Sequence, residues 1–229
     1  FHFHFEKAST RECATAKSGN LAAGLTHHPR TPLLCKPFLS TAWAARRCRP
    51  CPCSRLKSGG LVTSTFGYAT AFHDFSAISQ RLAGRIAELA RQGDYVLIGH
   101  SLGGVLLRSA LTLLPADTPQ PSHVFLLGSP VLPSRLAQKM RRNIVFRAVT
   151  QDCGQLLGSD DRMAGIATVA RTTSIIGTKG ITGKLSPFGD EPNDGVVSVS
   201  ETRAAWITDE VQVPIVHTLL PASPTVADI

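Results

Sequence analysis

The sequence contains no uninterrupted apolar run near the ~20 residues that a membrane-spanning helix requires, so it predicts no transmembrane segment. It also lacks the polar, highly charged composition of a disordered chain, because 43% of its 229 residues are hydrophobic and only 17% are charged. A chain of this length and composition is expected to form an ordinary folded domain with its own core.

Excess positive charge is missing from most of the chain. Residues 1–57 hold ten Lys and Arg against two Glu, whereas residues 58–229 hold fourteen basic and fourteen acidic side chains. The formal net charge of +8 therefore comes entirely from the first quarter. Because the rest of the chain is neutral and the basic segment has few aromatic residues, we do not expect nucleic-acid binding.

Cysteine is also scarce beyond the first quarter. Five of the six cysteines precede residue 58, namely Cys13, Cys35, Cys48, Cys51 and Cys53. The sequence is therefore interpreted as an anomalous basic, Cys/Arg/Pro-rich segment over 1–57 followed by a domain over 58–229.

Downstream of residue 58, short apolar runs alternate with segments of helical periodicity. Runs that predict strands are 61–68, 95–98, 124–127, 173–176 and 211–216, and helical patterns span 75–92 and 105–114. The run Tyr95-Val96-Leu97-Ile98 has no polar alternation, which is typical of a strand covered on both faces. The sequence therefore predicts an α/β fold with a mainly parallel sheet flanked by helices.

The most informative motif is Gly99-His100-Ser101-Leu102-Gly103-Gly104, between the strand at 95–98 and the helix that follows. A nucleophilic serine at such a junction lies on a tight turn, with its hydroxyl projecting from the sheet edge. Gly99 and Gly103 leave space for neighbouring backbone, and the start of the helix directs N–H groups toward developing negative charge. The alternative is an ordinary turn between a strand and a helix.

A serine nucleophile needs a histidine base, and the base needs an acid that orients it. Only His123 and His217 follow Ser101. His123 immediately begins a predicted strand and is interpreted as an edge or core residue. His217 follows the last predicted strand, at the sheet edge that carries active-site loops, and is the candidate base.

The candidate acid is Asp194, in the loop Pro192-Asn193-Asp194-Gly195-Val196-Val197. Asp190 and Glu191 are rivals, because either could reach the same pocket from this loop. Asp160 and Asp161 are instead interpreted as the cap of a helix over 162–169, since aspartate is favoured at helix starts.

These three motifs, Gly99 to Gly104, Asn193 to Val197 and His217, resemble the lipase and esterase branch of the α/β-hydrolases over about residues 58–220. The resemblance implies an α/β-hydrolase fold with Ser101 as nucleophile, Asp194 as acid and His217 as base. It implies the Leu102 N–H as one oxyanion donor, and neither a metal nor a cofactor. Family members take a second donor from a His-Gly turn after an early strand, and this sequence shows no His-Gly there.

The segment 1–57 allows four interpretations. Cys48, Cys51 and Cys53 could bind zinc but lack a second Cys-x-x-Cys pair. A secretory signal would need a continuous apolar stretch that is missing, whereas a transit peptide or basic arm fits the Arg-rich, acid-poor composition. The favoured hypothesis is that this segment is disordered or out of frame, with the frame corrected near Ser54–Lys57.

The frame hypothesis rests on codon overlap. In the shifted frame, the third base of each codon is read with the first two bases of the next codon. This frame can encode a hydrophobic run and then His-Gly across Ser40–Ala42. That is where the family resemblance requires an oxyanion turn. A codon choice in the coding DNA that is incompatible with His-Gly at this place would disprove the hypothesis.

The predicted function is a serine hydrolase that cleaves carboxylic esters of small molecules or lipids through an acyl-enzyme. The alternative is a non-catalytic α/β-hydrolase-like binding protein or an inactive gene fragment that lacks the oxyanion turn. We expect a fold incomplete at its N-terminal strands and final helix, and a cytoplasmic location for want of an export signal.

The region Leu132–Val169, between two predicted strands, is expected to form a cap or acyl-binding face. Its basic residues are interpreted as a solvated helix face, and they are Arg135, Lys139, Arg141 and Arg142.

Overall fold

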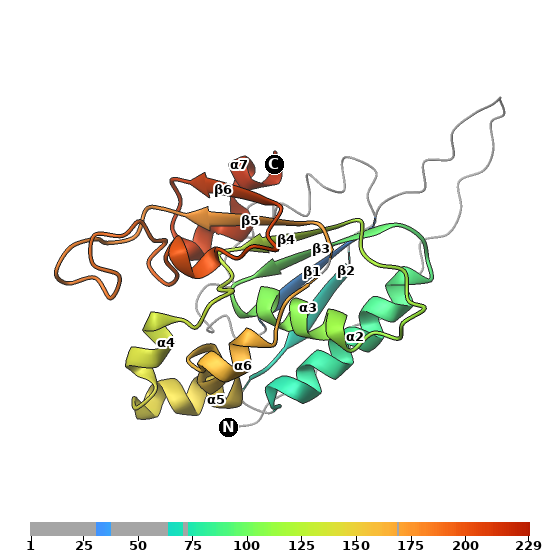
Figure 1. Cartoon of the computed structure of the whole chain (residues 1–229), viewed down its shortest axis with the longest axis horizontal. Coiled ribbons are helices and arrows are strands. Elements are labelled where there is room, and N and C mark those ends of the chain that lie inside the picture. The colour runs from blue at the N-terminus through green and yellow to red at the C-terminus, as the bar shows by residue number, and fades with distance from the viewer. Residues whose placement is uncertain (1–30, 38–63, 71–72, 169) are drawn as a thin grey trace, which may run out of the picture.

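The computed structural model describes residues 31–37, 64–70, 73–168 and 170–229. In these residues a single parallel sheet has the strand order β2-β1-β3-β4-β5-β6 (Figure 1). The strands are β1 (Thr31–Pro37), β2 (Ser64–Tyr68), β3 (Tyr95–His100), β4 (His123–Leu127), β5 (Thr172–Gly177) and β6 (Asp209–Val213). Because all strands run the same way, their carboxyl ends share one edge of the sheet.

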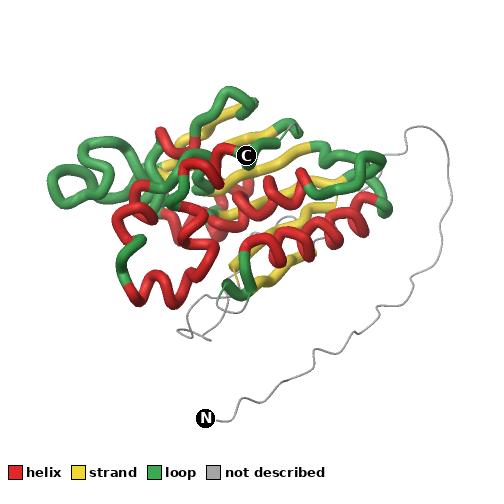
Figure 2. Tube along the Cα trace, turned by 60° about the horizontal axis from the view of Figure 1, so that its bottom comes forward, coloured by secondary structure: helices red, strands yellow, loops and turns green. Residues whose placement is uncertain are grey.

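Helices α2 (Phe75–Ala90) and α3 (Leu102–Thr112) pack against each other and cover one face of the sheet (Figures 1 and 2). Both have an apolar stripe with helical spacing, as in Ile78, Leu82 and Ile86 of α2, and these side chains form the main core. On the other face, Leu220 and Val226 pack against residues of β4, β5 and β6. They belong to η2 (His217–Ala222) and α7 (Pro224–Ala227).

Three helices lie between β4 and β5, where a cap was expected: α4 (Arg135–Met140), α5 (Ile144–Leu157) and α6 (Asp160–Ala164). The Ser134 and Asn143 side chains cap the first two helices by accepting hydrogen bonds from backbone N–H groups. The prediction of a helix over 162–169 is wrong in its bounds. The helix starts at Asp160, with Ser159 at the cap position, and it ends before Gly165.

Apart from α6, the predicted strands and helices from 75 to 176 are confirmed with small shifts of their ends, whereas two further elements differ from the prediction. No strand was predicted in 1–57, yet β1 lies there and pairs with both β2 and β3. Its apolar run is too short to show a period, so its pairing partners define it. The last strand is β6 rather than 211–216, because Pro214 lacks the N–H that would continue the ladder.

Several predictions concern residues outside the described ranges. These are the possible zinc ligands Cys48, Cys51 and Cys53 and the His-Gly reading across Ser40–Ala42. In the part of the chain that is described, no helix combines the length and apolar character needed to cross a membrane.

One residue inside α5 has a strained backbone. Gln151 has φ 47° and ψ −135°, and it separates two helical pieces of α5. A positive φ of this kind is sparsely populated by residues with a Cβ, and it costs them about 1–3 kcal/mol. The kink in α5 therefore lowers the stability of the fold.

We expect Gln151→Gly to raise the free energy of unfolding by about 1 kcal/mol, because relief of strain exceeds the entropy that glycine loses on folding. Urea unfolding followed by circular dichroism measures the change. Gln138→Gly, on the exposed face of the regular helix α4, is the matched control and should lower stability by about 1 kcal/mol. A loss of stability at both positions would contradict the assignment of strain to Gln151.

Candidate active site

Ser101 occupies the tight turn between β3 and α3, with φ 54° and ψ −128°. Two backbone hydrogen bonds enforce this conformation: the Ser101 N–H donates to the Leu127 carbonyl at 2.9 Å, and the Gly104 N–H donates to the Ser101 carbonyl at 3.0 Å. The serine side chain forms no capping hydrogen bond with α3. Its half-buried hydroxyl is therefore not committed to the helix that it precedes.

Two glycines allow α3 to pass close to the sheet behind this turn. A Cβ at Gly99 would lie 2.5 Å from the Gly104 Cα, and a Cβ at Gly104 would collide with the Ser129 side chain. The predicted elbow residue Gly103 is buried in the first turn of α3. Leu102 is the first residue of this helix, so its N–H has no carbonyl partner inside it.

Asp194 and His217, which are 23 residues apart, form a buried pair. The His217 Nδ1 lies 2.7 Å from the Asp194 Oδ2, and the two residues are 6% and 1% exposed. A carboxylate only accepts hydrogen bonds, so Nδ1–H donates, and in the neutral ring this tautomer leaves the lone pair on Nε2. The His217 N–H also donates to the Asp194 carbonyl at 2.9 Å, which fixes the histidine backbone.

The Asp194 carboxylate is held by its own loop. Its Oδ1 accepts hydrogen bonds from the N–H groups of Val196 and Val197 at 2.9 and 2.8 Å, leaving Oδ2 for His217. Gly195 has φ 100°, a conformation that favours glycine and that turns the chain back toward the carboxylate. The motif Asn193 to Val197 therefore builds a turn around one buried acid.

Gly128 connects the serine turn to this pair. It follows Leu127, the acceptor for Ser101, and has φ 52°. A Cβ at Gly128 would lie 2.7 Å from the Asp194 Oδ2 and 3.0 Å from the His217 Nδ1, so only glycine fits. The sequence analysis missed this residue, although Gly-Ser-Pro directly after a buried strand is a signal for a constrained turn.

The structure thus brings Asp194 and His217 into direct contact and places Ser101 at the same sheet edge. Among the hydrogen bonds of the described residues, there is none between the Ser101 hydroxyl and His217. The His100 ring, next to Ser101, lies 4.6 Å from the His217 ring between centroids, and its Nε2–H donates to the His217 carbonyl at 3.1 Å. His100 is a further contact between the two parts of the site.

The other candidate residues lie elsewhere. His123 begins β4 at the opposite edge of the sheet, where its Nε2 lies 2.8 Å from the Thr173 hydroxyl. Asp190 is exposed, and Glu191 pairs with Arg135 rather than with His217. Asp160 and Asp161 lie in α6.

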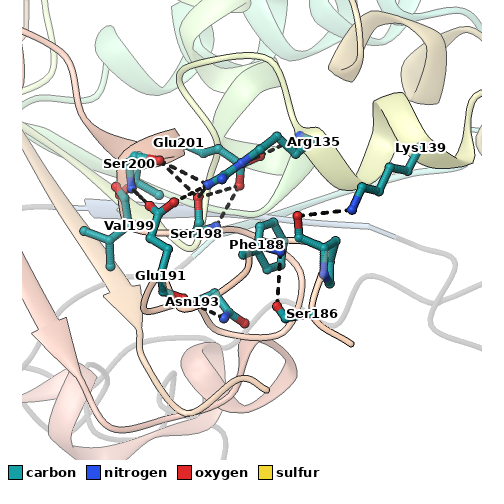
Figure 3. A network of polar contacts seen from close by, with 12 residues as sticks. Arg135, Lys139, Ser186, Phe188, Glu191, Asn193, Ser198, Val199, Ser200 and Glu201 are labelled. Atoms are coloured by element: carbon teal, nitrogen blue, oxygen red, sulfur yellow. Dashed lines mark hydrogen bonds and ion pairs between the residues drawn. The ribbon is translucent and has the colours of Figure 1, made fainter. Parts of the chain in front are cut away.

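A polar network joins α4 to the loop that carries Asp194, Pro192 to Val197, here called the acid loop (Figure 3). Arg135, predicted to be on a solvated helix face, contacts Glu191, Glu201 and Ser198. The Glu201 carboxylate, which is 4% exposed, accepts hydrogen bonds from the Arg135 N–H at 2.6 Å and the Ser198 N–H at 2.7 Å. Arg135 therefore lies on a partly solvated face, with its side chain 37% exposed, but its guanidinium is paired with these carboxylates.

Glu191, directly before the acid loop, belongs to the same network. It accepts from the Ser200 N–H at 2.7 Å and lies 2.5 Å from the Arg135 guanidinium. Burial acts to raise the pKa of Glu191, but hydrogen bonds from Ser200 and Arg135 together lower this pKa to about 2. A depressed carboxylate pKa stabilises the fold above the unfolded-state pKa, so this contribution is lost as the pH falls toward 2.

We expect Glu201→Gln to destabilise the protein by about 2–4 kcal/mol, because the amide puts a donor among buried donors and removes the partner of a cation. Thermal unfolding checks this. The matched control is Glu210→Gln, since Glu210 contacts Arg203 at 2.9 Å with both side chains over a third exposed, and it should lose less than about 1 kcal/mol. Equal losses in the two variants would show that the buried network adds no more stability than an exposed ion pair.

No protein-family model and no curated protein sequence matches this chain. Solved structures do match. The mature lipase BlEst2 of Bacillus licheniformis aligns with a TM-score of 0.64 and 18% sequence identity, over 86% of this chain and 89% of that one.

Two other similar structures come from different hydrolases. The metagenomic carboxyl esterase MGS0156 has a TM-score of 0.59 at 15% identity, over 83% of this chain and 65% of that one. The thioesterase RedJ of the Streptomyces coelicolor prodiginine pathway has a TM-score of 0.51 at 15% identity, over 91% and 93%. With its parallel sheet flanked by helices, the chain has the α/β-hydrolase fold that these lipases, esterases and thioesterases share.

Proposed function

We propose that this chain is a serine hydrolase that cleaves carboxylic esters, with Ser101 as nucleophile, His217 as base and Asp194 as the acid that orients the base. The observation that carries the proposal is the buried Asp194–His217 pair at the same sheet edge as the strained turn of Ser101. Structural similarity to hydrolases of oxygen esters and thioesters supports an acyl-transfer reaction.

In the proposed reaction, His217 Nε2 accepts the Ser101 proton as the serine oxygen attacks the ester carbonyl. The Leu102 N–H, at the start of α3, donates to the oxyanion of the tetrahedral intermediate. The protonated His217 then gives its proton to the leaving alcohol, and an acyl-serine remains. Water, deprotonated by His217, releases the acid in the second half of the reaction.

Asp194 has two tasks in this scheme. Its Oδ2 keeps the Nδ1–H of His217 in place, so that Nε2 is the basic nitrogen, and it stabilises the imidazolium that forms during attack. The hydrogen bond from Ser101 to His217 closes in the substrate complex, since catalytic hydrogen bonds are often long in free enzymes. The chemistry of these three side chains requires no cofactor.

The first test is intact-mass analysis after treatment with a fluorophosphonate, which bonds to a serine that a base activates. We expect a single adduct on the wild type and none on Ser101→Ala or His217→Ala, with all three folded by circular dichroism. A folded wild type without an adduct would instead support a non-catalytic binding protein or an inactive gene product.

The assignment of the acid is tested by kinetics on a p-nitrophenyl ester and on an acyl thioester in parallel. We expect Asp194→Asn to lower kcat on the order of 10⁴-fold, because the amide no longer fixes the productive tautomer of His217. Asp190→Asn, four residues away and exposed, is the control and should keep kcat within about twofold. A large loss from Asp190→Asn alone would transfer the role to Asp190.

A further inference from the structure

Arg108 is fully buried, without exposed surface, in α3 two helical turns after Ser101. Its guanidinium donates through Nη1 to the Ile166 carbonyl and through Nη2 to the Pro130 carbonyl, both at 2.6 Å. It also lies over the Trp206 ring, 5.5 Å from the centroid. Among the described residues, no acidic side chain forms a salt bridge with it, so this buried cation is held by carbonyl groups and an aromatic face alone.

A charge buried in this way is unfavourable for stability. Burial lowers the pKa of the Arg108 guanidinium to about 9, which reflects the loss of solvation of its charged form. A methionine or leucine of similar volume would fill the space without this loss. The presence of arginine at this position therefore needs a reason other than core packing.

The three contacts of Arg108 lie in three separate segments. Pro130 is in the segment that leaves β4, Ile166 is in the segment that leads from α6 toward β5, and Trp206 precedes β6. Pro130 and Ile166 thus mark the entrance and the exit of the α4–α6 region. A planar guanidinium can donate to two carbonyls at once, which a lysine ammonium on a flexible stem does with less geometric control.

Of these segments, the one that contains Pro130 contacts all parts of the candidate site. Leu127 accepts from the Ser101 N–H, and Gly128 lies against both Asp194 and His217. Val131 N–H donates to the Glu201 carbonyl at 2.8 Å, which ties the same segment to the acid loop. Residues 127–131 therefore lie between the nucleophile turn and the Asp194–His217 pair.

We propose that Arg108 is a positioning residue for catalysis: by holding the Pro130 carbonyl to α3, it sets the spacing between Ser101 and His217. This inference rests on the proposed function, since it concerns the geometry of the same site. Arg108 touches no substrate and takes no proton. Its effect passes through residues 127–130 to the Ser101 turn on one side and to the Asp194–His217 pair on the other.

The test compares Arg108→Met and Arg108→Lys with wild type. We measure kcat and KM for p-nitrophenyl acetate well below the unfolding midpoint, together with the rate of fluorophosphonate labelling of Ser101. For Arg108→Met we expect at least a tenfold fall in kcat with KM within twofold, and a matching fall in the labelling rate. Arg108→Lys, which retains a cation and one donated hydrogen bond, should recover part of both rates.

A matched variant separates positioning from general loss of stability. Leu82→Ala removes a fully buried side chain from α2, a helix that contributes none of residues 127–131. We expect it to lower the unfolding midpoint while kcat per folded molecule stays within twofold. A purely structural role for Arg108 would give the same pattern in its own variants, so a wild-type kcat in folded Arg108→Met would overturn the proposal.

Arg108→Lys decides the question if Arg108→Met does not fold. A folded lysine variant with wild-type kcat and labelling rate would also overturn the proposal, because the fork of two hydrogen bonds would then be dispensable. Failure of the proposed function is distinguishable from failure of the Arg108 proposal, because in the first case the wild type itself would show neither Ser101-dependent labelling nor ester hydrolysis.

Discussion

The hydrogen bond from the Ser101 N–H to the Leu127 carbonyl is the contact on which the site depends. It joins the carboxyl ends of two neighbouring parallel strands, just beyond the last paired residues His100 and Leu127. The bond requires Ser101 to adopt a left-handed conformation that a side chain disfavours. Hydrogen bonds, glycine contacts and the packing of α3 together supply the free energy that keeps the serine in this turn.

The acid side of the site is built differently. Asp194 does not depend on a strained residue with a side chain, because Gly195 and the N–H groups of Val196 and Val197 form a turn around its carboxylate. The loop as a whole is then fixed to α4 through Arg135 and Glu201. A local turn defines the direction of the carboxylate, and longer-range ion pairs define the place of the loop.

Part of the site was predictable because each motif specifies both a local backbone conformation and side chains of a particular chemistry. A buried strand, a glycine-flanked serine and an apolar helix follow one another without a gap, so the turn at Ser101 was predictable from the sequence. The order of residue types and the parallel sheet, which brings loops after different strands to one edge, predicted an acid from the 190–194 loop beside His217. They left Asp190 and Glu191 as rivals, and the structure places Asp194 in contact with His217.

Other features could not be predicted because they arise only from tertiary contacts. β1 has a short apolar run, and its identity as a strand depends on pairing with β2 and β3. Arg108 in an apolar helix looks like an exposed residue in the sequence, and only its tertiary contacts with the Pro130 and Ile166 carbonyls and the Trp206 ring explain its burial. The ion pairs of Arg135 were not predictable for the same reason, since its partners Glu191 and Glu201 are distant in the chain.

The position of β1 between β2 and β3 also has a consequence for how the protein folds during synthesis. Leu33 pairs with Ser64 on one side and with Leu97 on the other, so the second partner leaves the ribosome long after β1 itself. Until β3 is made, β1 presents an open edge that other chains can bind. The strand that carries Ser101 at its end thus covers the open edge of β1, and its own far edge stays open until β4 pairs with it.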